Sequence, residues 1–285
     1  MKLPVQLIEC PRDAMQGWSH PIATSDKVAY INQLLKVGFH TIDFGSFVSP
    51  KAIPQMADTA DVIRQLEYDS NRHNLLAIVA NLRGAEAAMS FPNIDYLGFP
   101  FSVSPTFQRR NTNSTIEESL DTVKAIQQLC TAHNKQLVVY LSMGFGNPYG
   151  DAWSPQVVFD WANQLASLGI GTLSLADTVG VASPDQVHDL TAYLVQQMPG
   201  TTIGVHLHAT AQNWREKMKA AYTAGCRRYD GALKGFGGCP MAGNDLVGNM
   251  DTLWLIEYLE ESGEDLGLDK EALDKAVSMA GQIFV

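Results

Sequence analysis

The stretch "ASLGIGTLSL" at positions 166–175 ends one amphipathic run, turns at a glycine and enters a short apolar run. The same passage through glycine recurs in "KVGFHTID" at 36–43 and in "TAGCRRYD" at 223–230. Short apolar runs rich in β-branched residues alternate with longer amphipathic ones along the whole chain. This alternation is typical of repeated strand and helix units around a parallel sheet.

The number of these units predicts the architecture. Eight runs are predicted to be strands, at residues 7–10, 41–47, 75–80, 96–101, 136–143, 172–178, 202–208 and 228–236. Helix patterns between them, such as "STIEESLDTVKAIQQLCTAHN" at 114–134, begin after Ser or Thr and end at Gly or Asn. Eight strands, each followed by a helix, predict an α/β fold with a closed (β/α)8 barrel, the TIM barrel.

We expect one TIM-barrel catalytic domain over residues 1–285, with "LDKEALDKAVSMAGQIFV" at 268–285 as an added C-terminal helix. An open doubly wound sheet is the alternative fold. That fold requires a glycine fingerprint after the first strand, and "ECPRDAMQG" at 9–17 has none.

Composition excludes several classes of function. The formal net charge is -10 and no run of Lys and Arg exceeds two residues, which argues against a nucleic-acid or anionic-membrane partner. The first residues lack the apolar core of a signal peptide, and no stretch reaches about 18 apolar residues, so we expect a cytoplasmic protein. The four cysteines show no CxxC spacing and are expected to be reduced, with Cys130 and Cys226 in the core.

Catalytic groups of such barrels gather at the C-terminal ends of the strands. Polar side chains occur there in this sequence. Cys10 ends strand one, and Arg12, Asp13 and Gln16 follow it before a helix is expected to begin. Asp43 is in strand two, Asp177 is at the end of strand six, and His206 and His208 are in strand seven. The two histidines are two residues apart, so they point to the same face of their strand.

Closure of the barrel predicts a metal site, because it makes strand eight the neighbour of strand one. Five polar side chains are then expected to meet: His206, His208, Asn249, Asp13 and Asp43. Two imidazoles, a carboxylate and an amide oxygen suit an octahedral Mg²⁺ or Mn²⁺ with open positions for substrate. Zn²⁺ stays open, although Cys239 would then be expected as a ligand. Each residue alone also has a structural explanation, as a cap, a turn residue or a filler of a polar barrel layer.

The glycine-rich "GFGGCPMAG" at 235–243 has too many glycines for a helix and too little polarity for a solvated linker. We interpret it as a mobile loop able to close over a site. Cys239 at its centre has a structural alternative, but the preceding glycines favour an accessible thiol that can donate or accept a proton.

These residues resemble those of the 3-hydroxy-3-methylglutaryl-CoA lyases, members of the metal-dependent barrel lyases and aldolases. The likeness covers nearly the whole chain and is carried by "PRDAMQ" at 11–16 beside the family's PRDGLQ, "SFVSPKAIPQM" at 46–56, "NTNSTIEES" at 111–119, "SLADTVGV" at 174–181, "VHLH" at 205–208, and "GGCP" at 237–240 followed by "GN" at 248–249. "SFVSPK" and "GGCP" discriminate best, because the HxH and the Arg-Asp pair are shared with isopropylmalate-synthase-like enzymes and oxo-acid aldolases.

The resemblance implies cleavage of 3-hydroxy-3-methylglutaryl-CoA to acetyl-CoA and acetoacetate, as in leucine degradation, by a homodimer. It implies that Mg²⁺ or Mn²⁺ is bound by Asp13, His206, His208 and Asn249. The implied catalytic residues are Arg12 at the substrate carbonyl, Cys239 on the flexible loop, and Asp43 and Asp177 as acid/base groups or as partners of the ligands. The acyl-CoA substrate would contact Gln16, Ser46, Asn113, Tyr140 and Lys51, with "QRRN" at 108–111 as a further candidate for the coenzyme phosphates.

Four departures from the family pattern concern this site. Asp43 stands where the family has Glu, which shortens the side chain by a methylene. Ala209 replaces the Asp after HxH and removes a carboxylate partner for a histidine. The spacing before Asn249 is one residue longer than expected, which leaves Asn244 as a second ligand candidate. Lys234 replaces a small residue and is expected to pair with Asp43 or a substrate carboxylate.

Two other functions remain open at this point. A Claisen-type condensing enzyme or a related hydroxy-acyl-CoA lyase would use the same ligands on another substrate. A metal- and acyl-CoA-binding barrel without turnover is suggested by Asp43 and Ala209. The first is distinguished by its products, and the second by the absence of product under any divalent cation.

Overall fold

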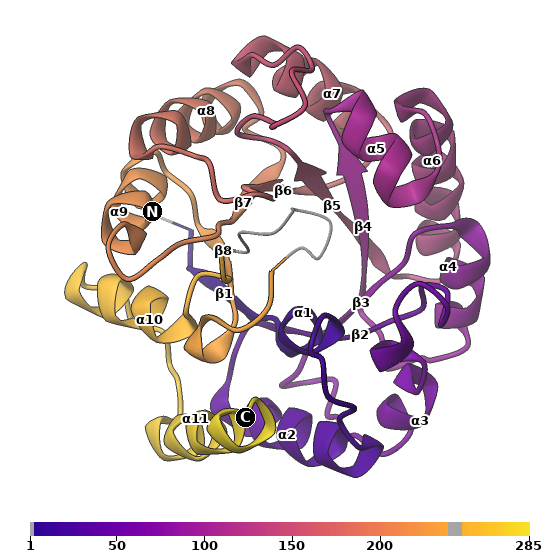
Figure 1. Cartoon of the computed structure of the whole chain (residues 1–285), viewed down its shortest axis with the longest axis vertical. Coiled ribbons are helices and arrows are strands. Elements are labelled where there is room, and N and C mark those ends of the chain that lie inside the picture. The colour runs from indigo at the N-terminus through magenta and orange to yellow at the C-terminus, as the bar shows by residue number, and fades with distance from the viewer. Residues whose placement is uncertain (1–2, 239–246) are drawn as a thin grey trace.

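The chain folds into a closed barrel of parallel strands that follow one another in sequence order, with β8 hydrogen-bonded to β1 (Figure 1). The computed structural model describes residues 3–238 and 247–285. The strands are β1 (Gln6–Glu9), β2 (Thr41–Ser46), β3 (Leu75–Ile78), β4 (Tyr96–Ser102), β5 (Gln136–Ser142), β6 (Thr172–Ala176), β7 (Thr202–His206) and β8 (Arg228–Gly231). The predicted fold class, a (β/α)8 barrel, is confirmed.

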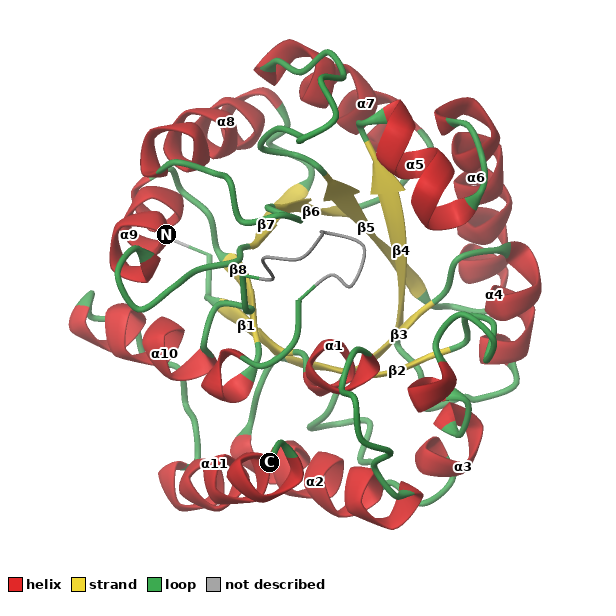
Figure 2. Ribbon diagram, in the orientation of Figure 1, coloured by secondary structure: helices red, strands yellow, loops and turns green. Residues whose placement is uncertain are grey.

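Helices surround the barrel on its outer side, except for the first, short helix, which lies over the rim of the barrel (Figure 2). They are α1 (Pro11–Gln16), α2 (Thr24–Val37), α3 (Thr59–Ile63), α4 (Leu82–Met89), α5 (Pro105–Thr112), α6 (Ile116–Ala132), α7 (Pro155–Ser167), α8 (Pro184–Gln197), α9 (Trp214–Thr223), α10 (Thr252–Glu261) and α11 (Lys270–Ile283), with short 3-10 turns η1 (Pro54–Met56) and η2 (Leu233–Gly235). Helix starts follow the capping residues. Thr115 forms a capping box with Glu118 in α6, and the Ser154 side chain caps α7.

The predicted C-terminal helix is α11, which packs beside α2 (Figure 1). Just beyond it, the ring of Phe284 lies 5.4 Å from that of Trp18 and 4.7 Å from that of Phe236, measured between centroids. Trp18 follows α1 and Phe236 follows η2. Phe284 therefore packs against the segments that follow β1 and β8, the two strands that close the barrel.

Some element boundaries differ from the sequence-based expectation. "PRDAMQ" forms the short helix α1, with Pro11 in its first turn, where the missing N–H needs no partner. A helix of so few turns shows no amphipathic period in the sequence. β7 ends at His206, and His208 instead forms an isolated antiparallel bridge with Asn249. β8 ends at Gly231, before η2.

Most apolar side chains pack between the strands and the surrounding helices, and Cys130 and Cys226 are buried there as predicted. A second, smaller apolar cluster is formed by Leu76, Ile78, Val138 and Tyr140. Within the described ranges, no helix has the length and apolar character needed to cross a membrane.

Glu9 in β1 is a fully buried carboxyl group that connects β1 to the segment after β8. It accepts hydrogen bonds from the Leu233 backbone N–H (2.9 Å) and from Thr252 Oγ1 (2.5 Å). Burial raises the pKa of Glu9 to about 8, although both hydrogen bonds act to lower it. Glu9 therefore anchors both flanks of the segment that carries Asn249.

We expect Glu9 to make the free energy of unfolding fall as pH rises. Its folded pKa of about 8 lies above its ordinary value of 4.5, so its contribution is complete below pH 4.5 and is lost as pH rises through 8. The slope from this group is at most about 1.4 kcal/mol per pH unit. Urea unfolding of Glu9→Gln should show a flatter pH dependence than the parent over this range. Parallel curves for the two proteins would contradict the assignment.

Candidate active site

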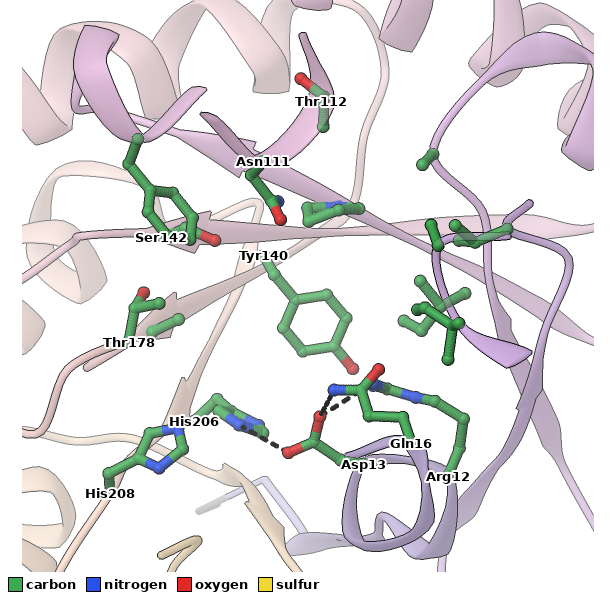
Figure 3. Close-up of a pocket in the computed structure, with 18 residues that line it drawn as sticks. Arg12, Asp13, Gln16, Asn111, Thr112, Tyr140, Ser142, Thr178, His206 and His208 are labelled. Carbon is green, nitrogen blue, oxygen red and sulfur yellow. Dashed lines mark hydrogen bonds and ion pairs between the residues drawn. The ribbon is translucent and has the colours of Figure 1, made fainter. Parts of the chain in front are cut away.

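A cavity of about 310 Å³ opens where the C-terminal ends of the strands meet. Its walls are largely apolar, formed by Val48, Ala52, Ile53, Ile78, Ala80, Pro100, Phe107 and Ala176. Polar side chains from distant parts of the chain also line it: Arg12, Asp13, Gln16, Asn111, Thr112, Tyr140, Ser142, Thr178, His206 and His208 (Figure 3). An apolar wall with a few convergent polar groups is the usual form of a small-molecule site.

Asp13 lies at the centre of the polar side of this cavity (Figure 3). Its Oδ1 accepts hydrogen bonds from Arg12 Nη1 (2.8 Å) and Gln16 Nε2 (2.6 Å). Its Oδ2 accepts one from Asn249 Nδ2 (2.7 Å) and lies 3.8 Å from His206 Nε2. Burial acts to raise the pKa of Asp13, but Arg12 and the two histidines outweigh it and lower the pKa. The carboxylate is therefore charged at neutral pH.

Each histidine is held through its Nδ1 atom. Nδ1 of His208 lies 2.9 Å from the carbonyl oxygen of Val247, so it carries the proton and donates it. Nδ1 of His206 lies 3.3 Å from Asp230 Oδ2. A histidine fixed in this way presents Nε2 to a cation, as metal-binding histidines usually do.

Asn249 completes the set of candidate ligands. Its Nδ2 donates to Asp13 and to the carbonyl oxygen of Phe236 (2.9 Å). Its Oδ1 is buried and has no hydrogen-bond partner among residues 3–238 and 247–285. Buried polar atoms without a partner are rare, and a cation would satisfy this one. The four predicted ligands lie together, and their donor atoms fit a hard divalent cation.

A second possible cation group lies deeper, where ligand atoms of Cys10, His206 and Asp230 fall within 4.8 Å of one another. Burial, together with nearby carboxylates, raises the pKa of the Cys10 thiol well above its usual range, so the metal-binding thiolate is disfavoured. Asp230 already pairs with Arg228 Nη1 at 2.7 Å. Of these three residues, only His206 lines the cavity. The set around Asp13 is therefore the better cation site.

Asp230 was not predicted from the sequence, and the structure places it behind His206. Its carboxylate contacts the His206 ring, a role that Ala209 cannot fill because it has no carboxylate. The His208 ring is held by the backbone carbonyl of Val247 instead. A signal was present in "RYDG" at 228–231, because residues two apart in a strand share a face and Arg228 and Asp230 both point inward.

Replacing Asp230 by Asn should weaken cation binding by about 10- to 100-fold, the usual effect of losing such a partner. The reason is that Asn cannot provide the charge that orients the His206 ring and balances Arg228. Titration with Mn²⁺, followed by electron paramagnetic resonance of the free ion, measures the change. Asp160→Asn on α7 is the control, since its partner is Gln156 on the exposed surface. An unchanged affinity in Asp230→Asn would contradict the assigned role.

Arg12 is fixed between two carboxylates at the cavity wall. Its Nε and Nη2 donate to Asp43 Oδ2 at 3.0 and 2.5 Å, and its Nη1 donates to Asp13. Burial acts to lower the pKa of Arg12, but Asp43 and Asp13 raise it, so the group is always charged. Burial raises the pKa of Asp43 to about 6 against the effect of Arg12. Asp43 lies behind Arg12 and does not line the cavity.

Asp177 also lies outside the cavity lining. Its Oδ2 accepts a hydrogen bond from Lys217 Nζ (2.7 Å), and its Oδ1 accepts one from the Ala182 backbone N–H (3.0 Å). Both oxygens are thus occupied by the protein itself. This geometry supports the second of its two predicted roles, as a partner of the ligand residues.

The predicted substrate contacts are only partly brought together. Gln16 and Tyr140 line the cavity, and the Tyr140 hydroxyl is buried without a hydrogen-bond partner in the described part of the chain. Ser46 is buried beside the cavity, where its Oγ accepts from the Val48 N–H (3.2 Å). Asn113 follows the last residue of α5, in the left-handed region, and does not line the cavity; the two preceding residues, Asn111 and Thr112, do.

The basic side chains predicted to contact the substrate do not line the cavity. Lys51 is exposed in a turn, and Arg110 stacks on Tyr149 with its Cζ 4.6 Å from the ring centroid. Nζ of Lys234 lies against Gly281 of α11, so the expected pairing with Asp43 is wrong. Cys239 and Asn244 lie outside the described residues.

Comparisons with known proteins agree with this geometry. The HMGL-like family model matches residues 5–279. The hydroxymethylglutaryl-CoA lyase of Pseudomonas mevalonii is 32% identical over 263 residues, which cover 92% of this chain and 86% of the relative. The hydroxymethylglutaryl-CoA lyase YngG of Bacillus subtilis is 35% identical over 251 residues, which cover 88% and 83%.

Solved structures give the same result. The HMG-CoA lyase of Bacillus subtilis superposes with a TM-score of 0.92 at 33% identity, covering 99% of this chain and 95% of that one. The HMG-CoA lyase of Acinetobacter baumannii, solved in complex with coenzyme A and 3-methylmalate, has a TM-score of 0.91 at 31% identity, covering 99% and 91%. With nearly its whole length matched, this chain belongs to the HMGL-like family.

Proposed function

We propose that this protein is a divalent-metal-dependent carbon-carbon lyase that cleaves 3-hydroxy-3-methylglutaryl-CoA to acetyl-CoA and acetoacetate. One observation supports this most directly: Arg12 and the ligand candidates Asp13, His206 and His208 line a single cavity. The names of the relatives at 30% identity and above support the same substrate.

The cation is proposed to be Mg²⁺ or Mn²⁺, bound by Asp13, His206, His208 and Asn249. Mg²⁺ and Mn²⁺ prefer hard ligands to thiolates, and this set offers one carboxylate, one amide oxygen and two imidazoles. When bound, the cation acts as a Lewis acid toward the substrate's hydroxyl and carbonyl oxygens.

The proposed reaction is a retro-Claisen cleavage. A base takes the proton of the tertiary hydroxyl, and the electron pair of that O–H bond forms the ketone of acetoacetate. The carbon-carbon bond breaks, and its electron pair passes into the enolate of the acetyl thioester. A proton donor then protonates the enolate carbon to give acetyl-CoA.

Arg12 is the proposed stabiliser of the enolate oxygen. Its contacts with Asp13 and Asp43 use three of its N–H groups, and an arginine has about five. One N–H on each terminal nitrogen is left for a substrate oxygen. Preorganised donors of this kind usually supply the largest single part of catalysis.

Asp43 is the proposed base. Its pKa of about 6 keeps it ionised near neutral pH while remaining close enough to that pH for efficient proton transfer. Both oxygens of Asp43 accept hydrogen bonds from Arg12, and Asp43 does not line the cavity, so this role requires a relay, for which we propose a water molecule beside Arg12. Cys239 stays the predicted donor of the final proton.

For the acyl-CoA, we keep Gln16 and Tyr140 as contacts of the acyl group and add Asn111. The coenzyme A bound by the Acinetobacter baumannii relative supports an acyl-CoA substrate. Ser46, Asn113 and Lys51 stay predictions, as do a single catalytic domain over residues 1–285, the homodimer and the cytoplasmic location.

A metal-screened assay tests the proposal. The purified protein is incubated with 3-hydroxy-3-methylglutaryl-CoA and Mg²⁺, Mn²⁺ or Zn²⁺, and acetyl-CoA and acetoacetate are quantified beside the Cys239→Ser variant. We expect equal amounts of both products with Mg²⁺ or Mn²⁺ and none after chelation. Consumption of acetyl-CoA with an oxo acid would identify a condensing enzyme. Metal binding without product under every cation would identify a binding protein.

A further inference from the structure

We propose that Lys217 is a positioning residue of the cation site, which holds the main chain of His208 and the carboxylate of Asp177 in fixed relation. The proposal rests on the cation site of the function proposed above. Lys217 is on α9, outside the cavity, and none of the sequence motifs includes it.

The contacts of Lys217 are complete and entirely internal. Its Nζ donates to Asp177 Oδ2 (2.7 Å), to the His208 carbonyl oxygen (2.8 Å) and to the Gly180 carbonyl oxygen (3.4 Å). An ammonium group has about three N–H donors, so all of them are used. The Lys217 side chain is 1% exposed, as is that of Asp177.

Burying such a pair is not favourable in itself. Desolvation of both charges offsets most of their attraction, and apolar residues of similar volume often stabilise a core equally well. An explanation from stability alone is therefore weak. The specific gain is geometric, because one nitrogen fixes three acceptors that belong to two different loops.

These loops lead directly to the candidate ligands. The Asp177 backbone N–H donates to the His206 carbonyl oxygen (2.9 Å), and the Asp177 carboxylate reaches the His208 carbonyl through Lys217. Asp177 and Lys217 thus connect the end of β6 to both histidines. The His208 ring is held separately by Val247. Together these contacts restrict both the backbone and the ring of His208.

The arrangement parallels the one beneath His206, where the Arg228–Asp230 pair contacts the ring. Each candidate histidine ligand therefore has a buried ion pair behind it. The His206 pair acts on the ring, and the His208 pair acts on the main chain. Neither Lys217 nor Asp177 touches the cavity, so both act through the histidine.

The test measures Mn²⁺ binding by Lys217→Met without any substrate, using electron paramagnetic resonance of the free ion. We expect the Kd for Mn²⁺ to rise by about 10- to 100-fold, the range found when partners of metal ligands are removed. Saturating Mn²⁺ should restore most of the lyase kcat, because the ligand atoms themselves are still present.

Lys27→Met is the matched control. Lys27 is also a buried lysine that joins a carboxylate, Asp58 (2.7 Å), to a backbone carbonyl, that of Gln55, but it lies on α2 and neither acceptor belongs to a candidate ligand. Its replacement should lower the melting temperature to a similar degree and leave the Mn²⁺ affinity unchanged. Equal weakening of Mn²⁺ binding in both variants would overturn the proposal, since the effect would then be general destabilisation.

If Lys217→Met does not fold, the double variant Lys217→Met/Asp177→Asn is measured in its place, because it leaves no carboxylate unpaired. Wild-type affinity in the folded variant overturns the proposal, as does a wild-type protein that binds no Mn²⁺. A wild-type protein that binds Mn²⁺ but releases no acetoacetate overturns the proposed function alone, and the affinity comparison still decides the role of Lys217.

Discussion

Replacing Arg12 by Lys is expected to lower kcat by about 100- to 1,000-fold, the usual effect of removing one preorganised donor from an oxyanion. Lysine keeps the positive charge between Asp13 and Asp43, but one ammonium nitrogen cannot bond both carboxylates and still face a substrate oxygen. The melting temperature should move by only a few degrees, because no carboxylate is left without a cation.

The choice of lysine follows from the structure. Arg12→Met would leave the buried carboxylates of Asp13 and Asp43 without a cationic partner. Breaking a buried ion pair in this way lowers the free energy of unfolding by about 3–5 kcal/mol. Loss of activity in that variant would not separate catalysis from folding. The control is Arg215→Lys on the exposed face of α9, whose partners are Glu257 and Glu261. Arg12→Lys activity within tenfold of the parent would exclude Arg12 as the stabiliser of the enolate.

Replacing His206 by Ala is expected to abolish most activity, with a fall in kcat/KM of at least about 1,000-fold. A metal ion that acts as a Lewis acid stabilises the transition state by several kcal/mol. Each increase of about 1.4 kcal/mol in the activation barrier lowers the rate by a factor of about ten. The Kd for Mn²⁺ should rise in parallel, since one of four candidate ligands is removed. Asp230 keeps its bond to Arg228, so the fold should survive.

His40→Ala is the appropriate control for this variant. His40 is a partly buried imidazole beside Thr41, at the other end of the barrel, where Nδ1 lies 2.9 Å from Thr41 Oγ1. Its replacement should leave both Mn²⁺ affinity and turnover near those of the parent. A His206→Ala protein that binds Mn²⁺ as tightly as the parent would remove His206 from the ligand set.

The fold was predictable because its signals are local. The caps at Thr115 and Ser154 depend on side chains within one turn of a helix. The passage from a helix through glycine into a strand recurs at 36–43, 166–175 and 223–230, and the number of strands predicts the barrel. The short helix α1 was missed, because so few residues carry no helical period and its start lacks a side-chain cap.

Position along a strand fixes the direction of a side chain, and this part of the candidate site was predictable from the sequence. His206 and His208 share a face, and closure of β8 onto β1 brings Asn249 to Asp13. Asn113 shows the limit of a motif, because it lies just beyond the last residue of α5, whereas Asn111 inside that helix lines the cavity. Lys234 was misplaced for the same reason, since η2 directs its side chain toward α11.

The sequence by itself determined the order of strands and helices, the barrel, and the rim on which the polar residues gather, because periodicity and capping act over neighbouring residues. Only the tertiary structure decided which buried charges pair: Asp43 with Arg12, Asp230 with Arg228 and Asp177 with Lys217. These pairings depend on distances of a few ångströms across the closed barrel. Residues far apart in the chain set those distances, so no local pattern records them.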